Sequence, residues 1–195
     1  MKNKFYGEEV DDSSEKEEIV LKVPKITTVN NYIINLDEDI EVPNHYRKVF
    51  ETLRIATKDD TITFNINSPG GYIDTMIQFY DLMLNTKAKT IANIYQACSA
   101  ASVIALCCDE INATRFSYMM IHSMSTGTYG KISDIEGYAT FAVKQDIEIA
   151  NTIYGGFITP AEIKLVNKGK EVWLNQKEIQ ERLKNFKSIK TRFLK

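Results

Sequence analysis

The stretch that decides the fold is Ile94-Tyr95-Gln96-Ala97-Cys98-Ser99-Ala100-Ala101-Ser102-Val103-Ile104-Ala105-Leu106. A β-prone run, residues 90–95, ends there in a cluster of small residues, and an apolar, helix-like run follows through Cys108. A serine at such a strand-to-helix turn holds its hydroxyl in the positive field of the helix N-terminus, as several unrelated hydrolases hold their nucleophiles. Ser99 is thus a candidate nucleophile, and close helix packing is the alternative that this stretch alone leaves open.

The overall composition is that of a globular protein. Of the 195 residues, 44% are hydrophobic and 26% are charged, which is typical of one soluble domain with a substantial core. The net charge of -2 gives no reason to expect nucleic acid or a membrane as a partner. We expect a cytoplasmic protein, because the sequence has neither a membrane-length apolar run nor a signal peptide. Three cysteines in apolar sequence, Cys98, Cys107 and Cys108, predict buried thiols in a reducing compartment.

Charge patterning predicts three segments. The first 18 residues hold seven acidic residues and three lysines, so we interpret residues 1–22 as a disordered tail or a removable leader. Residues 23–183 form the folded domain. The last segment, residues 184–195, holds five basic residues and no acidic one, and its composition predicts a solvated basic tail.

Hydrophobic periodicity predicts strands that alternate with helices, which indicates an α/β fold. The strand at 61–66 is the clearest, because its apolar residues alternate strictly. Capping signals predict a long helix from Ser133 to about Gly155, a helix at Thr159–Pro160, and a last helix from Asn175. The other predicted strands cover residues 32–36, 90–95, 110–113, 118–121 and 171–174.

Two further features are candidates for a functional site. Asn67-Ser68-Pro69-Gly70-Gly71 follows the strand at 61–66, but the Walker lysine and the G-x-G-x-x-G spacing of phosphate-binding loops are absent. The loop is either a simple turn or a place where glycine lets backbone N–H groups approach a substrate carbonyl. His122 ends an apolar strand, where it is either a site residue or a histidine satisfied in the core.

Four motifs in order resemble the proteolytic subunit of the Clp protease, over roughly Tyr32 to Gln180. They are Ile66-Asn67-Ser68-Pro69-Gly70-Gly71 with Tyr80-Asp81, then Gln96-Ala97-Cys98-Ser99, Met120-Ile121-His122, and Gly130-Lys131-Ile132-Ser133-Asp134-Ile135-Glu136. The resemblance implies an α/β fold of the Clp protease and crotonase type, a spiral of repeated β-β-α units with a protruding strand-helix handle.

The resemblance also implies the site residues. Ser99 corresponds to the nucleophile and His122 to the general base, while Glu171 stands where the family has an aspartate as third member of the triad. Backbone N–H groups of Gly71 and Ala100 correspond to the oxyanion hole. The family chemistry needs no metal and no organic cofactor.

The function implied is that of a serine endopeptidase that hydrolyses short peptides or unfolded proteins through an acyl-enzyme. The family assembles as stacked seven-membered rings that enclose the sites, and the helix from Ser133 with residues 127–131 would form the ring-to-ring handle. An AAA+ unfoldase partner would follow from the family. Ala100-Ala101 after the serine, Glu171, and the two tails depart from the family pattern.

Three alternatives stay open on the sequence alone. One is a bacteriophage head-maturation protease of the same fold, which would act without an ATPase. The second is a catalytically inactive, structural subunit of mixed rings. The third is a crotonase-like acyl-CoA enzyme, which would share the fold and the backbone oxyanion hole without needing the pair Ser99 and His122.

Overall fold

The computed structural model describes residues 28–193, so the expectation for residues 1–22 lies outside the described part of the chain. Five strands form one sheet in the order β1-β2-β3-β4-β5. The first four strands are parallel, and β5 pairs antiparallel with β4. The strands are β1 (Asn31–Leu36), β2 (Thr61–Ser68), β3 (Lys89–Cys98), β4 (Glu110–Ile121) and β5 (Val172–Asn175).

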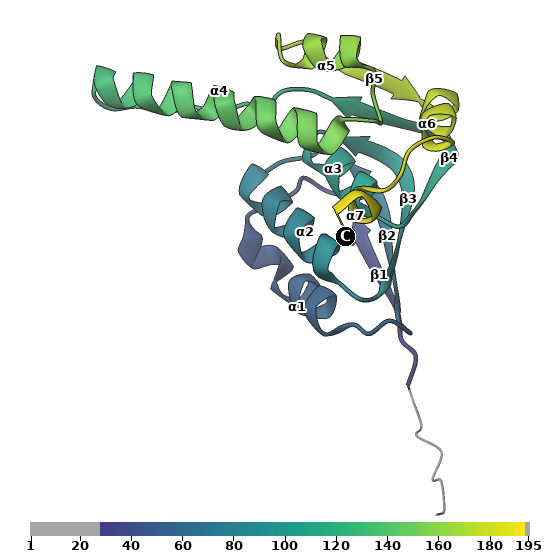
Figure 1. Cartoon of the computed structure of the whole chain (residues 1–195). Coiled ribbons are helices and arrows are strands. Elements are labelled where there is room, and N and C mark those ends of the chain that lie inside the picture. The colour runs from purple at the N-terminus through teal and green to yellow at the C-terminus, as the bar shows by residue number, and fades with distance from the viewer. Residues whose placement is uncertain (1–27, 194–195) are drawn as a thin grey trace, which may run out of the picture.

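The helices cover the sheet in one main layer (Figure 1), where α1 and α2 lie to the left of the strands in this view and α4 projects from the body as a long arm. The short helices α5 and α6 flank β5, and α7 packs near α2 and α3. The helices are η1 (Pro43–Tyr46), α1 (Arg47–Ile55), α2 (Ile73–Asn85), α3 (Ala100–Cys107), α4 (Ile132–Tyr154), α5 (Pro160–Val166), α6 (Gln176–Leu183) and α7 (Ile189–Phe193).

The core lies between the sheet and this helical layer. On β2 the alternating residues Ile62, Phe64 and Ile66 are fully buried, as the period of two predicts. All eight residues of α3 are buried, because this helix packs against β2, β3 and β4 on one side and α2 on the other. A helix that is apolar all round fits only such a central place, and α3 carries the Ser99 turn at its N-terminus.

The opposite face of the sheet carries a ladder of asparagines. Asn35, Asn65, Asn93 and Asn112 lie side by side on β1, β2, β3 and β4. Each amide donates to the carbonyl oxygen of the next asparagine toward β1, at 2.9, 3.0 and 3.2 Å. The ladder satisfies these side chains within one face of the sheet and marks the same level on four strands.

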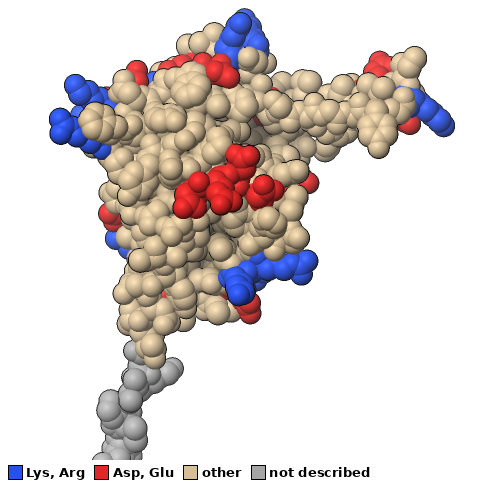
Figure 2. All heavy atoms as spheres, turned by 180° about the vertical axis from the view of Figure 1, so that it is seen from behind, with Lys and Arg blue, Asp and Glu red and all other residues tan. Residues whose placement is uncertain are grey.

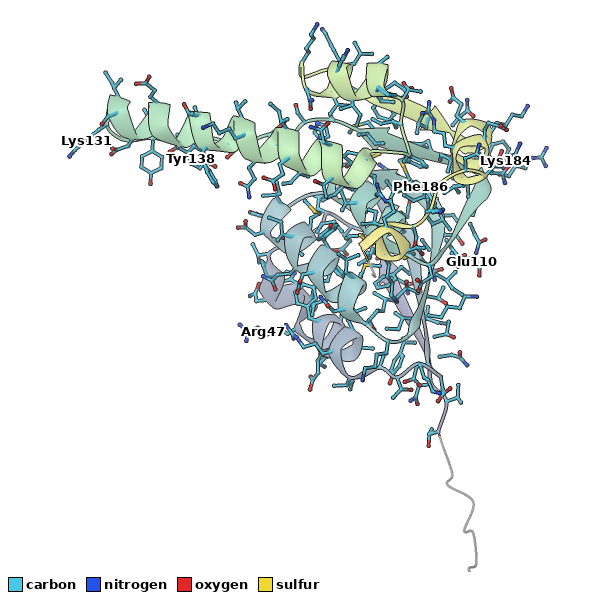
Figure 3. The ribbon with its side chains drawn as sticks, in the orientation of Figure 1. Arg47, Glu110, Lys131, Tyr138, Lys184 and Phe186 are labelled. Carbon is cyan, nitrogen blue, oxygen red and sulfur yellow. The ribbon has the colours of Figure 1, made fainter. Side chains whose placement is uncertain are left out.

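The arm consists of α4 and the extended segment that leads to it, residues 122–131. Two contacts hold the segment against the helix: the Met124 N–H donates to Asp146 at 2.8 Å, and the hydroxyls of Thr126 and Tyr138 lie 2.5 Å apart. Lys131 and Tyr138 lie toward the outer end of the arm (Figure 3). None of the helices in residues 28–193 has the length and apolar character needed to cross a membrane.

Two predictions about the bounds of secondary structure are wrong. The predicted strands at 110–113 and 118–121 are parts of one strand, β4, because a register shift opposite residues 94–96 lets the pairing continue. The capping box expected from Ser133 to Glu136 does not form, since α4 begins at Ile132 and Ser133 bonds to Asp134.

The C-terminal stretch differs from the solvated tail that its composition predicts. Residues 189–193 form α7 instead, so the helix from Asn175 is not the last one. Ile189 and Lys190 are buried, and the Lys190 ammonium group bonds to the Ala88 carbonyl and to Asp109 at 3.2 and 3.3 Å. Bonds to a carboxylate and a carbonyl offset the free-energy cost of removing the ammonium group from water. The charge of the segment alone does not indicate such partners.

Candidate active site

Ser99 occupies the turn between β3 and α3 in a strained conformation. Its φ of 52° and ψ of −125° make it the one non-glycine residue with positive φ among residues 28–193. Side chains rarely adopt this region, and it persists where surrounding contacts impose it, often at functional sites. A serine on a sharp strand-to-helix turn is also the arrangement that exposes a nucleophilic hydroxyl.

His122 lies beside this turn because β3 and β4 are parallel neighbours. Cys98 pairs with Met120 at the ends of the two strands, and the Ser99 N–H donates to the Met120 carbonyl at 2.8 Å. The next residues along β4 bring His122 level with the serine, and the distance from Ser99 Oγ to His122 Nε2 is 2.8 Å. Residues that are 23 apart in sequence thus form a hydrogen-bonded pair.

The double-glycine loop approaches the serine from β2. A Cβ atom on Gly70, whose φ is +99°, would lie 2.6 Å from the Cys98 carbonyl oxygen and from Ser99 Cβ, so only glycine fits there. A Cβ atom on Gly71 would lie even closer to the Ile40 carbonyl oxygen. Within residues 28–193, the N–H groups of Gly71 and Ala100 have no hydrogen-bond partner.

A cleft of about 620 Å³ surrounds these groups and is lined by Gly71, Ser99, Ala100 and His122. Its apolar part comes from α2, α3 and α4 and includes Met76, Val103 and Ile149. The charged residues that line it are all acidic: Asp39, Glu41 and Asp146. Figure 2 shows the back of the molecule, where acidic side chains gather near the middle of the face and basic ones toward its margins.

Glu171 lies near the pair but does not contact it. The antiparallel pairing of Ile121 with Val172, continued by one residue, places Glu171 opposite His122. Its side chain is exposed and accepts a hydrogen bond of 2.9 Å from the Trp173 indole N–H. Among the described residues, no hydrogen bond joins His122 to a carboxylate.

The groups around Ser99 and His122 limit the reactions that the site can perform. Burial raises the pKa of the Cys98 thiol, which therefore stays protonated and does not compete with Ser99 as a nucleophile. The three cysteines are free and buried, as their sequence context predicts. No three His, Cys, Asp or Glu side chains of residues 28–193 gather into a metal-binding group. The arrangement can thus perform proton transfer and nucleophilic attack through Ser99 and His122.

Two residues of the site carry no sequence signal of their own. Ser102 Oγ donates to the Ser99 carbonyl at 2.7 Å and lies 2.9 Å from the Tyr154 hydroxyl. Ser102 is one of several small residues in an apolar helix, and Tyr154 ends α4, 52 residues further on. Only the packing of α4 against α3 brings them together.

Comparison with known proteins identifies the family of this chain. A model of the Clp protease family matches residues 16–181. The chain belongs to the Clp protease family. The α/β fold and the family resemblance predicted from the sequence are thereby confirmed, and the mixed sheet with its helical layer and arm is consistent with the fold of the Clp protease.

Two curated Clp protease relatives share parts of the chain. The ATP-dependent Clp protease proteolytic subunit 3 of Rhizobium meliloti (strain 1021) is 27% identical over 129 residues, which are 63% of this chain and 65% of that protein. The ATP-dependent Clp protease proteolytic subunit 1 of Thermobifida fusca (strain YX) is 36% identical over 90 residues, 44% of this chain and 40% of that protein. This chain therefore matches less than two thirds of the length of each relative.

Proposed function

We propose that the protein is a serine endopeptidase whose nucleophile is Ser99 and whose general base is His122. The observation that carries the proposal is the 2.8 Å contact between Ser99 Oγ and His122 Nε2 at a strained strand-to-helix turn. Two backbone N–H groups without partners, on Gly71 and Ala100, lie in the same cleft and supply the oxyanion hole. The family assignment supports peptide bonds as the substrate.

In the first step His122 Nε2 takes the hydroxyl proton as Ser99 Oγ forms a bond to the scissile carbonyl carbon. The electron pair of the C=O double bond moves to the carbonyl oxygen, which the N–H groups of Gly71 and Ala100 stabilise. When the C–N bond breaks, the imidazolium returns its proton to the leaving amine, and an ester on Ser99 remains.

In the second step a water molecule replaces the amine. His122 removes a proton from the water as its oxygen bonds to the ester carbonyl, and the same oxyanion hole receives the new negative charge. Collapse breaks the bond to Ser99 Oγ, which regains its proton from His122. The peptide acid leaves, and the free enzyme is restored without any cofactor.

Glu171 is the proposed third member, which would hold the His122 tautomer and stabilise the imidazolium. Its place opposite His122 in the β4–β5 pairing supports this role. In the described conformation Trp173 holds the carboxylate, so the side chain must turn from the indole to the imidazole when the triad forms. The side chain is exposed, and this turn needs no repacking of the core.

The arm supports assembly into a larger oligomer, which we propose to be the stacked seven-membered rings of the family. Large apolar side chains on the arm are exposed: Tyr129 and Ile132 at 97% and 85%, and Phe141 and Val143 at 58% and 59%. A monomer rarely exposes such a concentration of apolar surface without a partner. The use of an AAA+ unfoldase, unfolded proteins as substrates and a cytoplasmic location belong to the same proposal.

A second candidate is a structural subunit without activity. It is favoured by one observation, the bond between Glu171 and Trp173, which leaves the imidazole without a carboxylate partner in residues 28–193. This candidate predicts the same fold and assembly but no reactive serine.

The deciding experiment is labelling of the purified oligomer with a fluorophosphonate, measured by intact mass, beside Ser99→Ala and His122→Ala. We expect one adduct on Ser99 in the wild type, none in Ser99→Ala, and labelling at least about 100-fold slower in His122→Ala. Hydrolysis of a fluorogenic peptide library by the same samples tests the substrate class. An oligomeric wild type that neither labels nor cleaves would support the structural subunit.

A further inference from the structure

A relay of two buried hydroxyls lies behind the nucleophile turn. The distance from Ser102 Oγ to the Ser99 carbonyl oxygen is 2.7 Å, and the distance from Ser102 Oγ to the Tyr154 hydroxyl is 2.9 Å. A carbonyl oxygen only accepts, so the single hydroxyl hydrogen of Ser102 points to Ser99 and Tyr154 is the donor to Ser102. The relay therefore has one direction, from Tyr154 through Ser102 to the Ser99 carbonyl.

The end of this relay belongs to the same peptide group as one oxyanion donor. The Ser99 carbonyl and the Ala100 N–H are parts of one planar, trans peptide unit, in which they point in opposite directions. Ser102 holds the carbonyl from one side through its hydroxyl at 2.7 Å and its own N–H at 2.9 Å. The Ala100 N–H is thereby turned away from Ser102, and it has no partner among the described residues.

We propose that Ser102 and Tyr154 are positioning residues that set the direction and the donor strength of the Ala100 N–H in the oxyanion hole. This inference rests on the proposed function. A hydrogen bond to the carbonyl of an amide polarises the unit and strengthens its N–H as a donor. The relay thus acts on the oxyanion most when the negative charge develops, and hardly at all on the bound substrate.

The surroundings keep the relay intact under working conditions. Ser102 is fully buried and Tyr154 is 4% exposed, so water does not compete for their hydroxyls. Burial raises the pKa of the Tyr154 hydroxyl, which therefore remains a neutral donor at neutral pH. The Met120 carbonyl holds the Ser99 N–H on the other side of the turn at 2.8 Å, and together these contacts maintain the strained φ of 52°.

The relay also connects the arm to the catalytic turn. Tyr154 is the last residue of α4, the helix of the arm, and its hydroxyl reaches Ser102 of α3, three residues after the nucleophile. A displacement of the base of α4 would change the bond to Ser102 and, through it, the orientation of the peptide after Ser99. The oxyanion hole therefore depends on a helix that lies mostly outside the body.

The experiment compares Ser102→Ala, Tyr154→Phe and the double variant in the assembled protein. Ser117→Ala is the matched control, because Ser117 is also buried and donates to a carbonyl three residues earlier, at 2.8 Å, away from the cleft. For each variant we would measure kcat and KM for one peptide, and the affinity for the boronate of the same peptide. The tetrahedral boronate adduct places an oxygen where the oxyanion develops.

We expect Ser102→Ala to lower kcat about 10- to 30-fold, less than the loss of a complete oxyanion donor, with KM changed less than twofold. Boronate affinity should fall by about the same factor as kcat. Tyr154→Phe should cost about threefold, and the double variant should match Ser102→Ala, because the two hydroxyls act in series. Ser117→Ala should keep wild-type kinetics.

Distinct outcomes separate the two proposals. A wild type that cleaves and labels, with Ser102→Ala and Tyr154→Phe equal to it in kcat and boronate affinity, overturns the relay and leaves the peptidase proposal standing. Equal losses in kcat, substrate binding and folded fraction would show a purely structural role and also overturn it. If Ser102→Ala does not fold, Tyr154→Phe decides, since it removes a single oxygen atom. A wild type without a reactive serine overturns both proposals.

Discussion

The two sides of the candidate site differ in how the fold holds them. On the serine side, Ser99 and His122 meet at 2.8 Å, and buried strands and an apolar helix fix the backbone that carries them. On the acid side, Glu171 is exposed and bonds to Trp173 instead of the imidazole. The serine side is already a hydrogen-bonded pair, whereas on the acid side no hydrogen bond between Glu171 and His122 forms in the described residues.

The difference follows from burial. Around Ser99, packing leaves one arrangement of the backbone, because any other would leave buried N–H and C=O groups without partners. Around Glu171, water solvates the carboxylate in either position, and its bonds to an indole N–H or an imidazole N–H differ by no more than about 1 kcal/mol. The acid side can therefore change with assembly or substrate, while the serine side remains fixed.

Glu171→Gln tests whether the acid side takes part in catalysis, and it is the change with the largest expected effect. A neutral amide does not stabilise the imidazolium and favours the wrong tautomer, so we expect kcat to fall about 10⁴-fold. Steady-state hydrolysis of a fluorogenic peptide measures it. Glu181→Gln, an exposed acid that pairs with Lys184, is the control and should keep full activity. A kcat within fivefold of wild type would remove Glu171 from the triad.

Gly70→Ala tests the serine side. The new Cβ would lie 2.6 Å from both the Cys98 carbonyl oxygen and Ser99 Cβ, and the loop must move away and take the Gly71 N–H with it. We expect kcat to fall about 10²- to 10³-fold, as for loss of an oxyanion donor. Gly156→Ala has a similar positive φ of +83° in open space, and it separates backbone strain from displacement. Equal kinetics of the two variants would contradict the expectation.

The scaffold of the acid side contains an ion pair, which should make the stability of the protein depend on pH. Glu162 of α5 accepts two hydrogen bonds of 2.8 Å from Arg182 of α6 and caps its own helix, on either side of β5. The Arg182 guanidinium and the Thr159 N–H and hydroxyl lower the pKa of Glu162 from 4.5 to about 2.

Because the folded-state pKa is depressed, the stabilisation is present above pH 4.5 and is lost as the pH falls from 4.5 to about 2. Glu162→Gln should lower the free energy of unfolding by about 2 kcal/mol at pH 7 and flatten its dependence on pH in that window. Urea unfolding at several pH values measures both. An unchanged slope below pH 4.5 would show that the ion pair contributes nothing.

Trp173→Phe has the smallest expected effect, and it tests directly whether the indole N–H competes with His122 for the Glu171 carboxylate. It keeps the aromatic ring but removes the N–H that holds Glu171, so the carboxylate is free to reach His122. We expect kcat to rise only about threefold, because water solvates the exposed carboxylate and the net contribution of the indole bond is at the low end of the usual ~0.5–1.5 kcal/mol. A fall of tenfold or more would mean that the indole bond belongs to the active arrangement.

Much of the fold could be predicted from local sequence. Strict alternation gives β2 its two faces, Thr159 forms its capping box with Glu162, and the strand-to-helix turn at Ser99 lies where small residues indicate it. These features depend on neighbours within a few positions. The capping signal at Ser133 did not predict the helix start correctly, because α4 begins at Ile132, one residue earlier, without a side-chain cap.

The remaining features depend on contacts between distant residues. The pairing of Ser99 with His122 could be predicted only because the family resemblance includes both of the motifs that contain them. Tyr154 joins the site through helix packing, and Lys190 is buried beside Asp109 although its segment looks like a charged tail. The side-chain direction of Glu171 is a competition between two donors, which no pattern in the sequence records.

The asparagine ladder has a consequence for how the site is assembled during folding. Parallel strands have no hairpin turn to fix their alignment, and a shift by two residues would keep every apolar side chain on the core face. Such a shift moves one strand by about 6.6 Å against its neighbour. It would break the contact between Asn93 and Asn112 within β3 and β4, and it would separate Ser99 from His122 beyond the ends of these strands. The hydrogen bonds of the four asparagines therefore favour the register that brings Ser99 and His122 together over shifted registers that bury the same apolar side chains.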